Sequence, residues 1–229
     1  MQNLRIEPTP RRGFLASMAA AGAALGISGF RPSSAAASTL DPSLDPARGR
    51  ASDPAFEAWL ARIKGTHRQV FDAPAPNDGL PAIWPRVYMN TMNATYGDAQ
   101  GVTAVVILRH SAIGLAMNDA IWAKYGIGEQ IGVKDGDKPA TRNVYANITN
   151  LPLPGLGIQN LLKDGVLVGA CDVAMTIASS GAAAKMGLDP AEVRKEWVAG
   201  LFPGVQLVPS GVMAVGRAQE LHCTYCFAG

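Results

Sequence analysis

The sequence has few cysteines, little excess charge of either sign and no long hydrophobic run. Three cysteines among 229 residues are too few for a disulfide-stapled scaffold. No apolar run reaches the roughly 18 residues that a membrane-spanning helix needs, so we expect no stable membrane insertion of the mature chain. A formal net charge of +2 lacks the clustered basic excess that is typical of nucleic-acid binding. Hydrophobic residues make up 48% of the chain, which is enough to bury a core and excludes wholesale disorder.

The chain also lacks the sequence motifs of nucleotide binding and of serine hydrolases. No Gly-x-Gly-x-x-Gly or P-loop sequence follows any predicted strand, so nucleotide binding is unsupported and we expect no bound cofactor. A serine hydrolase of the α/β type would need a Gly-x-Ser-x-Gly elbow, and the chain has none.

The N-terminus is typical of an export signal. The segment Pro10-Arg11-Arg12-Gly13-Phe14-Leu15 holds an arginine pair and is followed by a weakly apolar run over residues 16–30. Ser34-Ala35-Ala36-Ala37 then offers a cleavage site of the A-x-A type. We predict a twin-arginine signal over residues 1–37 and a periplasmic protein; the alternative is an amphipathic helix of the mature chain. Residues 38–52 are predicted to be a flexible lead-in, and residues 53–229 a single domain.

The mature chain alternates between strand and helix patterns. Residues 102–108 form a continuous β-branched and apolar run, which suits a strand buried on both faces of a parallel sheet. Asp53 and Pro54 have the chemistry of a helix start, and Pro85 should interrupt or begin a helix. The expected strands are 69–71, 102–108, 166–170 and 205–208, and the expected helices begin at 54 and span 80–96, 112–125, 156–163, 172–186, 190–197 and 211–224, with an insertion loop at 134–150. This order predicts an α/β fold in which helices cover both faces of a mostly parallel sheet.

Ligand sites of such sheets lie at the carboxyl ends of the strands. Three segments follow the clearest strands, so we expect their side chains along a single edge. These segments are Arg109-His110-Ser111, Cys171-Asp172 and Pro209-Ser210-Gly211.

Cys171 closes a strand and opens a helix. Backbone N–H groups at a helix N-terminus favour a thiolate, and Arg109 or His110 nearby would add to this effect. Cys171 is therefore a candidate nucleophile, or else a small buried hydrophobic residue. His110 could act as a base or hydrogen-bond donor, or could simply satisfy a backbone carbonyl. Ser210 could donate a hydrogen bond at the site, or could cap the last helix.

The C-terminal segment holds a Cys-x-x-Cys pair at the predicted end of the last helix. It lacks the following histidine that covalent haem attachment requires. In an oxidising compartment we expect a Cys223–Cys226 disulfide, with a structural or regulatory role. The alternative is a metal site made by His222, Cys223 and Cys226, although a single pair of cysteines is only half of a zinc site.

Several segments resemble the DsrE/DsrF-like sulfur-relay family. They are residues 105–110, residues 162–175 and residues 208–212 with 217–219; the most specific is a Gly-Val strand that ends in a cysteine and leads into a helix of short side chains. The resemblance covers roughly residues 66–226. It implies a compact α/β sandwich assembled as a trimer or hexamer, and a cysteine, matched by Cys171, that accepts and passes on sulfane sulfur as a persulfide.

Three functions follow as hypotheses. The first is an exported sulfur carrier in which Cys171 holds the sulfur, Arg109 and His110 favour the thiolate or bind an anionic donor, and Ser210 donates hydrogen bonds; its partners would be a sulfur donor and acceptor. The second is a non-catalytic oligomeric module that binds a small ligand at the strand ends. The third is a metal-binding protein that uses His222, Cys223 and Cys226.

Overall fold

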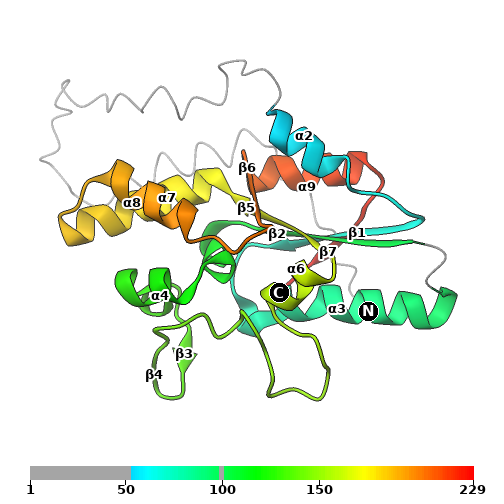
Figure 1. Cartoon of the computed structure of the whole chain (residues 1–229), viewed down its shortest axis with the longest axis horizontal. Coiled ribbons are helices and arrows are strands. Elements are labelled where there is room, and N and C mark those ends of the chain that lie inside the picture. Colours follow the sequence, from blue (N-terminus) through cyan, green and yellow to red (C-terminus); the bar gives the residue numbers. More distant parts are fainter. Residues whose placement is uncertain (1–52, 98–100) are drawn as a thin grey trace, which may run out of the picture. The chain divides into compact units, whose positions relative to one another are not determined.

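The computed structural model describes residues 53–97 and 101–229 (Figure 1). The predicted export signal at 1–37 and lead-in at 38–52 lie outside these residues. Within the described residues, no helix combines the length and apolarity that crossing a membrane takes. In chain order the elements are α2 (Pro54–Leu60), β1 (His67–Ala73), η2 (Asn77–Gly79), α3 (Leu80–Tyr96), β2 (Val102–Leu108), η4 (His110–Ala116), α4 (Asp119–Tyr125), α5 (Ile127–Gln130), β3 (Lys134–Asp135), β4 (Lys138–Pro139), α6 (Ile158–Lys163), β5 (Leu167–Cys171), α7 (Asp172–Met186), α8 (Pro190–Ala199), β6 (Gln206–Val208), α9 (Gly211–Glu220) and β7 (Thr224–Phe227), where η marks a 3₁₀ segment.

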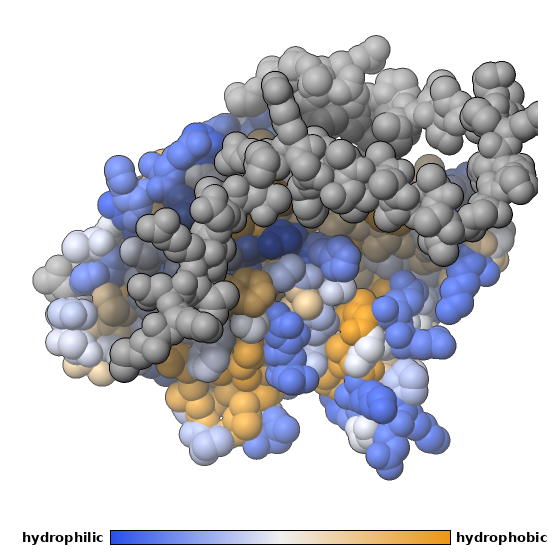
Figure 2. Space-filling view, turned by 180° about the vertical axis from the view of Figure 1, so that it is seen from behind, coloured by the Kyte–Doolittle hydropathy of each residue, from blue (hydrophilic) through white to orange (hydrophobic). Residues whose placement is uncertain are grey.

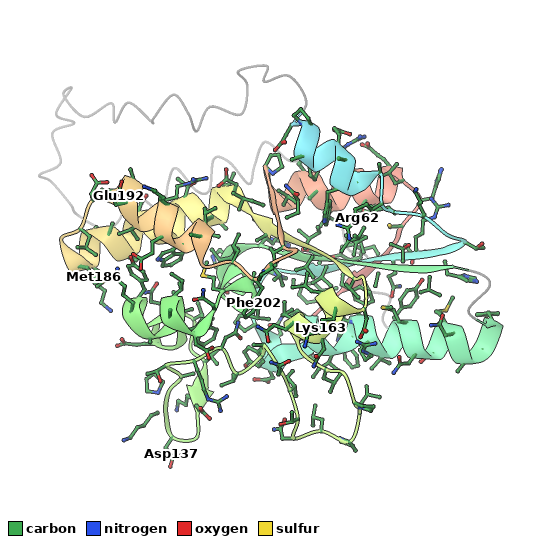
Figure 3. The ribbon with its side chains drawn as sticks, viewed as in Figure 1. Arg62, Asp137, Lys163, Met186, Glu192 and Phe202 are labelled. Atoms are coloured by element: carbon green, nitrogen blue, oxygen red, sulfur yellow. The ribbon has the colours of Figure 1, made fainter. Side chains whose placement is uncertain are left out.

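The main sheet has five strands in the order β6-β5-β2-β1-β7, and every neighbouring pair is parallel. This arrangement confirms the predicted α/β fold with a parallel sheet. Strands β3 and β4 form a separate antiparallel hairpin. Figure 3 places Asp137 at the tip of this hairpin, pointing away from the sheet.

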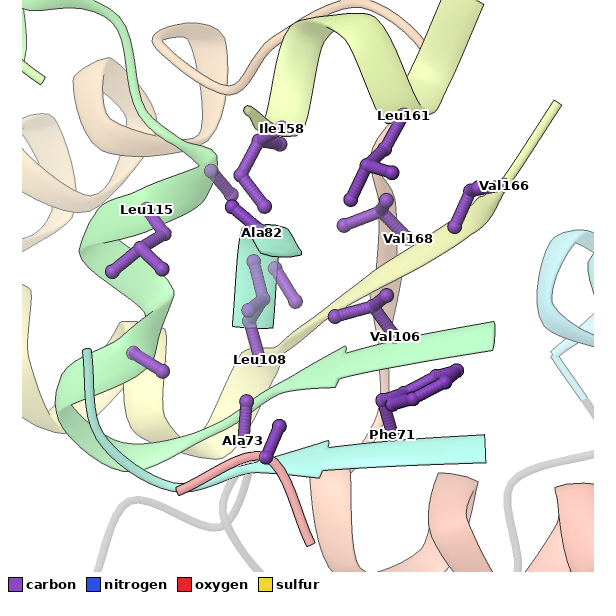
Figure 4. Close-up of a cluster of buried hydrophobic side chains, with 14 of the residues drawn as sticks. Phe71, Ala73, Ala82, Val106, Leu108, Leu115, Ile158, Leu161, Val166 and Val168 are labelled. Atoms are coloured by element: carbon purple, nitrogen blue, oxygen red, sulfur yellow. The ribbon is translucent and has the colours of Figure 1, made fainter. Parts of the chain in front are cut away.

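Helices cover both faces of the main sheet (Figure 1). One buried cluster lies between the sheet and α2 and α9, and includes Val105 and Ile107 of β2. The opposite cluster, against α3 and α6, includes Val106 and Leu108 of the same strand (Figure 4). Because successive strand residues point to opposite faces, burial on both sides requires the continuous apolar run of β2.

A third buried cluster lies beyond the carboxyl end of β5. Helices α7 and α8 pack on each other there, and α7 also contacts η4. Cys171 belongs to this cluster, together with Met175 and Trp197. The candidate thiol therefore sits where the sheet meets a helical layer.

Helix starts follow the sequence closely. The Asp53 carboxylate accepts the backbone N–H groups of Ala55 at 3.0 Å and Phe56 at 3.3 Å, and so caps α2 as predicted. Helix α7 has the predicted bounds.

Pro85 lies inside α3 and does not interrupt it. Its ring is buried, so packing offsets the hydrogen bond that a proline cannot donate.

The predicted helix over 112–125 is two elements. The 3₁₀ segment η4 ends at Ala116, and Met117 is extended. Asn118 then starts α4, because its side chain accepts the N–H of Ile121 at 3.1 Å. This cap competes with a continuous helix and produces the break.

The predicted last helix is too long at its C-terminal end. Helix α9 stops at Glu220, and His222 adopts a positive φ of 63° that reverses the chain. Residues 224–227 then pair with β1 as the edge strand β7. Thr, Tyr and Phe favour a strand there, and pairing with the sheet outweighs one further turn of helix.

The predicted insertion at 134–150 is anchored by one buried side chain. Asn143 is 3% exposed, and its Nδ2 donates hydrogen bonds to the carbonyl oxygens of Leu115 at 2.9 Å and Met117 at 2.8 Å. Its Oδ1 accepts the N–H of Tyr145 at 3.0 Å. The loop that follows carries Leu151, which is 43% exposed. Figure 2 shows hydrophobic residues on the lower part of the molecule, where Figure 1 places this loop.

Candidate functional site

The carboxyl ends of all five strands meet at one edge of the sheet, because every pairing is parallel. This edge brings Arg109, after β2, and Cys171, at the end of β5, to the first residue of α9, Gly211. A Cβ built on Gly211 would lie 2.6 Å from the Arg109 Cβ and 3.2 Å from the Cys171 Cβ. Arg109 and Cys171 therefore both pack closely against Gly211.

Cys171 caps the 15-residue helix α7 with its sulfur. The Sγ atom accepts a hydrogen bond from the backbone N–H of Ala174 at 3.4 Å. The partial positive charge of a helix N-terminus favours an anion at this position. The neighbouring Asp172 carboxylate is ion-paired with Arg194, which offsets its negative charge. The Cys171 side chain is a free thiol and the residue is 6% exposed.

Arg109 forms a two-point ion pair with a buried carboxylate. Its Nε donates to Oδ1 of Asp72 at 2.6 Å, and its Nη2 donates to Oδ2 at 3.0 Å. The hydroxyl of Tyr225 donates to the same Oδ2 at 3.0 Å. The hydrogen bond to Asp72 raises the pKa of Arg109, and Cys171 adds a smaller electrostatic contribution in the same direction. The guanidinium is therefore held in its charged form.

Asp72 and Tyr225 were not among the residues that the sequence pointed to. The predicted first strand ended at Phe71, whereas β1 continues to Ala73 and carries Asp72 inside its buried part. A carboxylate between apolar residues near a strand end is the signal that could have found it, since a buried charge needs a partner. Nothing local indicates Tyr225, because its contact depends on β7 joining the sheet.

Ser210 occupies the N-cap position of α9, as one reading of the sequence expected. Its backbone carbonyl accepts the N–H of Ala214 at 2.9 Å. Its side chain, however, makes no capping hydrogen bond to the helix. The half-buried hydroxyl lies next to Gly211 in the chain and so borders the site.

His110 lies at the surface, which suits the predicted contact with Cys171 poorly. The residue is exposed at the start of η4, with a positive φ of 49°. No hydrogen bond joins its ring to Cys171 in the described part of the chain. His110 is therefore adjacent to Arg109 in sequence without sharing its contacts.

The structure does not bear out the predicted Cys223–Cys226 disulfide, since both are free thiols. Cys223 is buried in the cluster under α2 and α9, whereas Cys226 packs against the opposite cluster under α3. Residues three apart on an extended chain are separated by about 10 Å, and a disulfide needs Cα atoms within about 7 Å. The pairing of β7 with β1 therefore keeps the two sulfurs on different faces of the sheet.

The same geometry argues against the alternative metal site of His222, Cys223 and Cys226. Cys223 is buried, while His222 is exposed at the chain reversal. Across residues 53–97 and 101–229, no three His, Cys, Asp or Glu side chains gather closely enough to hold a metal ion.

We expect Cys223 and Cys226 to remain unbridged in the folded protein. Burial raises the pKa of both thiols, which keeps them protonated and slow in thiol–disulfide exchange. Peptide mapping after alkylation in denaturant without a reductant should recover both cysteines in the alkylated form. Closing the bridge with an oxidant should lower the melting temperature, because β7 must leave the sheet. A bridged pair in the native protein with an unchanged melting temperature would contradict this.

A shallow cavity of about 310 Å³ is lined by neither Cys171 nor Arg109. It is formed by α3 and the edge of the sheet, and is lined by Gln69, Phe71, Trp84, Val87, Tyr88, Thr91, Met92 and Cys226. A small-ligand pocket was expected at the strand ends, whereas this apolar cavity lies along the flank of β1 and β7.

We expect the substitution Gly211→Ala to destabilise the protein. Replacing this glycine with alanine would force a methyl group against the Arg109 and Cys171 stems, and overpacking of this kind costs about 1–3 kcal/mol. Urea unfolding should show this loss. The matched control is Gly216→Ala in the same helix, where a Cβ meets nothing within 4 Å. That change should raise stability by up to about 1 kcal/mol through helix propensity. Equal effects of the two substitutions would contradict the close approach.

No family model and no curated protein matches the chain.

Proposed function

We propose that the protein carries sulfane sulfur as a persulfide on Cys171. The observation that carries this proposal is the position of Cys171, whose Sγ accepts the Ala174 N–H at the start of α7 and whose Cβ packs against Gly211, as the stem of Arg109 does. A helix N-terminus favours a negative charge, and the thiolate is the nucleophilic form of cysteine.

The proposed reaction needs no metal ion or redox cofactor. The Cys171 thiolate attacks the outer sulfur of a persulfide donor, R–S–SH. A bond forms between Sγ and that sulfur, and the donor S–S bond breaks. The donor leaves as the thiolate RS⁻ with the bonding electron pair, and Cys171 retains –S–SH. Attack on a carrier persulfide by an acceptor thiolate passes the sulfur on in the same way.

The DsrE/DsrF-like relationship, export through the twin-arginine route and a periplasmic location belong to the same proposal, as does assembly into a trimer or hexamer. Exposed apolar side chains near the site support a partner surface. Ile177 on α7 is 66% exposed and Val212 on α9 is 72% exposed. Sedimentation of the purified protein as a monomer would contradict the assembly.

The test is the intact mass of the purified protein under non-reducing conditions, before and after treatment with polysulfide. We expect the mass of added sulfur, mapped to the Cys171 peptide and removed by a thiol reductant. An unmodified Cys171 would overturn the proposal.

One observation favours a second function. Cys171 is only 6% exposed, as expected of a residue that serves packing in a non-catalytic, oligomeric binding module. In that case iodoacetamide should alkylate Cys171 no faster than the buried Cys223 in the folded protein. Faster alkylation of Cys171 would instead support the carrier.

A further inference from the structure

The buried carboxylate of Asp72 connects three strands at the carboxyl edge of the sheet. Asp72 lies in β1 and is 5% exposed. It accepts two hydrogen bonds from Arg109, which follows β2, and one from Tyr225 of the edge strand β7. A buried carboxylate is tolerated only with such partners. The three donors therefore fix the carboxylate, and the carboxylate in turn fixes Arg109.

The ion pair uses only one edge of the Arg109 guanidinium. Asp72 takes Nε and Nη2, and Nη1 has no hydrogen-bond partner among the residues that the structure describes. The Arg109 side chain is 30% exposed, whereas that of Asp72 is 8% exposed. The free edge of a guanidinium presents parallel N–H groups that suit a planar or tetrahedral anion.

The stem of Arg109 and the Cβ of Cys171 both pack against Gly211. A Cβ on Gly211 would lie 3.3 Å from the Arg109 Cδ and 3.2 Å from the Cys171 Cβ. Only the hydrogen-sized side chain of a glycine fits between the two residues. Cys171 also contributes to the electrostatics of Arg109, so the two side chains sense each other. An anion bound by the free edge of Arg109 would lie at the same carboxyl edge of the sheet as the thiol.

We infer that Asp72 and Tyr225 are positioning residues, which orient Arg109 so that its free edge binds an anionic sulfur donor beside Cys171. This inference rests on the proposed function and names the class of donor: a sulfur compound with an anionic group, of which thiosulfate is the simplest. With thiosulfate, the Cys171 thiolate takes the outer sulfur, the S–S bond breaks and sulfite leaves with the electron pair. The charges balance, and no oxidant is needed.

The affinity for an anion should change in opposite directions in Asp72→Asn, depending on whether Asp72 orients Arg109 or acts only through its charge. That substitution removes one negative charge, so a purely electrostatic site would bind an anion more tightly. If orientation matters, the loss of the two-point contact frees the guanidinium, and anion binding weakens in spite of the more favourable charge.

The experiment measures thiosulfate binding by calorimetry in the Cys171→Ser protein, which cannot be loaded with sulfur. Loss of a charge-assisted contact in Arg109→Gln should weaken binding about tenfold or more. Asp72→Asn should weaken binding to a similar extent. Tyr225→Phe leaves the charge unchanged and should weaken binding about threefold. The control Tyr88→Phe removes a hydroxyl on the opposite face of the sheet and should have no effect.

Tighter or unchanged binding in Asp72→Asn would overturn the inference, as would unchanged binding in Tyr225→Phe or no binding at all in the Cys171→Ser protein. If Asp72→Asn fails to fold, Tyr225→Phe decides the outcome alone. The proposed function is tested separately, by sulfur loading of the unsubstituted protein. If the variants bind thiosulfate in the expected order but Cys171 of the unsubstituted protein takes up no sulfur, the carrier function is refuted and the positioning role of Asp72 and Tyr225 stands. If Cys171 takes up sulfur but the variants do not follow the expected order, the positioning role is refuted and the carrier function stands.

Discussion

Replacing Cys171 by serine is expected to abolish sulfur loading and leave the fold intact. Serine is among the best N-cap residues, so its Oγ can accept the Ala174 N–H that Sγ accepts in the native protein. The hydroxyl is smaller than the thiol and introduces no new charge. A persulfide, however, cannot form on oxygen. Mass spectrometry after polysulfide treatment should show no added sulfur on the 171 peptide, while circular dichroism and the urea midpoint stay close to those of the native protein.

The matched control is Cys226→Ser. Cys226 is more accessible than Cys171 but lies against the opposite cluster, away from α7 and Arg109. It has no helix N-terminus or ion-paired arginine at its sulfur, so its replacement should leave the loading of position 171 unchanged. If the Cys171→Ser protein still takes up sulfur and the Cys226→Ser protein does not, the sulfur is carried by Cys226. That result would refute the proposal.

Replacing Asn143 by alanine is expected to cause the largest loss of stability among polar substitutions in the insertion. The change removes the donor for two buried carbonyl oxygens, of Leu115 and Met117, and the acceptor for the Tyr145 N–H. Each buried polar group left without a partner costs about 1–3 kcal/mol. We expect a total of about 3 kcal/mol, measured as a lower midpoint in urea with an unchanged slope.

Asn147→Ala serves as the control for Asn143. Asn147 has the same side chain in the same insertion, but it is exposed and its amide donates only to Gln159 at 2.7 Å. Water replaces such a contact readily, so stability should change by less than about 0.5 kcal/mol. Similar losses in the two variants would show that Asn143 does not anchor the insertion.

The sequence alone predicted four of the five strands of the main sheet, all but β7, and most of the helices that cover it. The run at 102–108 is buried on both faces, as its composition requires, and has the predicted bounds. Helix starts with an aspartate cap and a following proline were also correct, at Asp53 and at Asp189. Both signals act over a few residues, so they can be recognised without knowledge of the rest of the chain.

The sequence was less informative where a local pattern fits two structures. Residues 112–125 are apolar at helical spacing, yet the cap at Asn118 divides them. The segment around Cys223 was predicted to extend the last helix, and its disulfide was inferred from compartment and spacing. Which of two locally acceptable conformations forms depends on the burial that distant parts of the chain provide.

By itself the sequence determined that the chain folds around a buried parallel sheet and that Cys171 lies where a strand passes into a helix, because hydrophobic period and capping are local properties. Only the tertiary structure decided that β7 joins the edge of the sheet, that Cys223 and Cys226 face different clusters, and that Tyr225 meets Asp72. Tyr225 and Asp72 are 153 residues apart in the chain. Their contact is stabilised by pairing of β7 with β1 and burial of the sheet edge, and no local sequence signal reports that free energy.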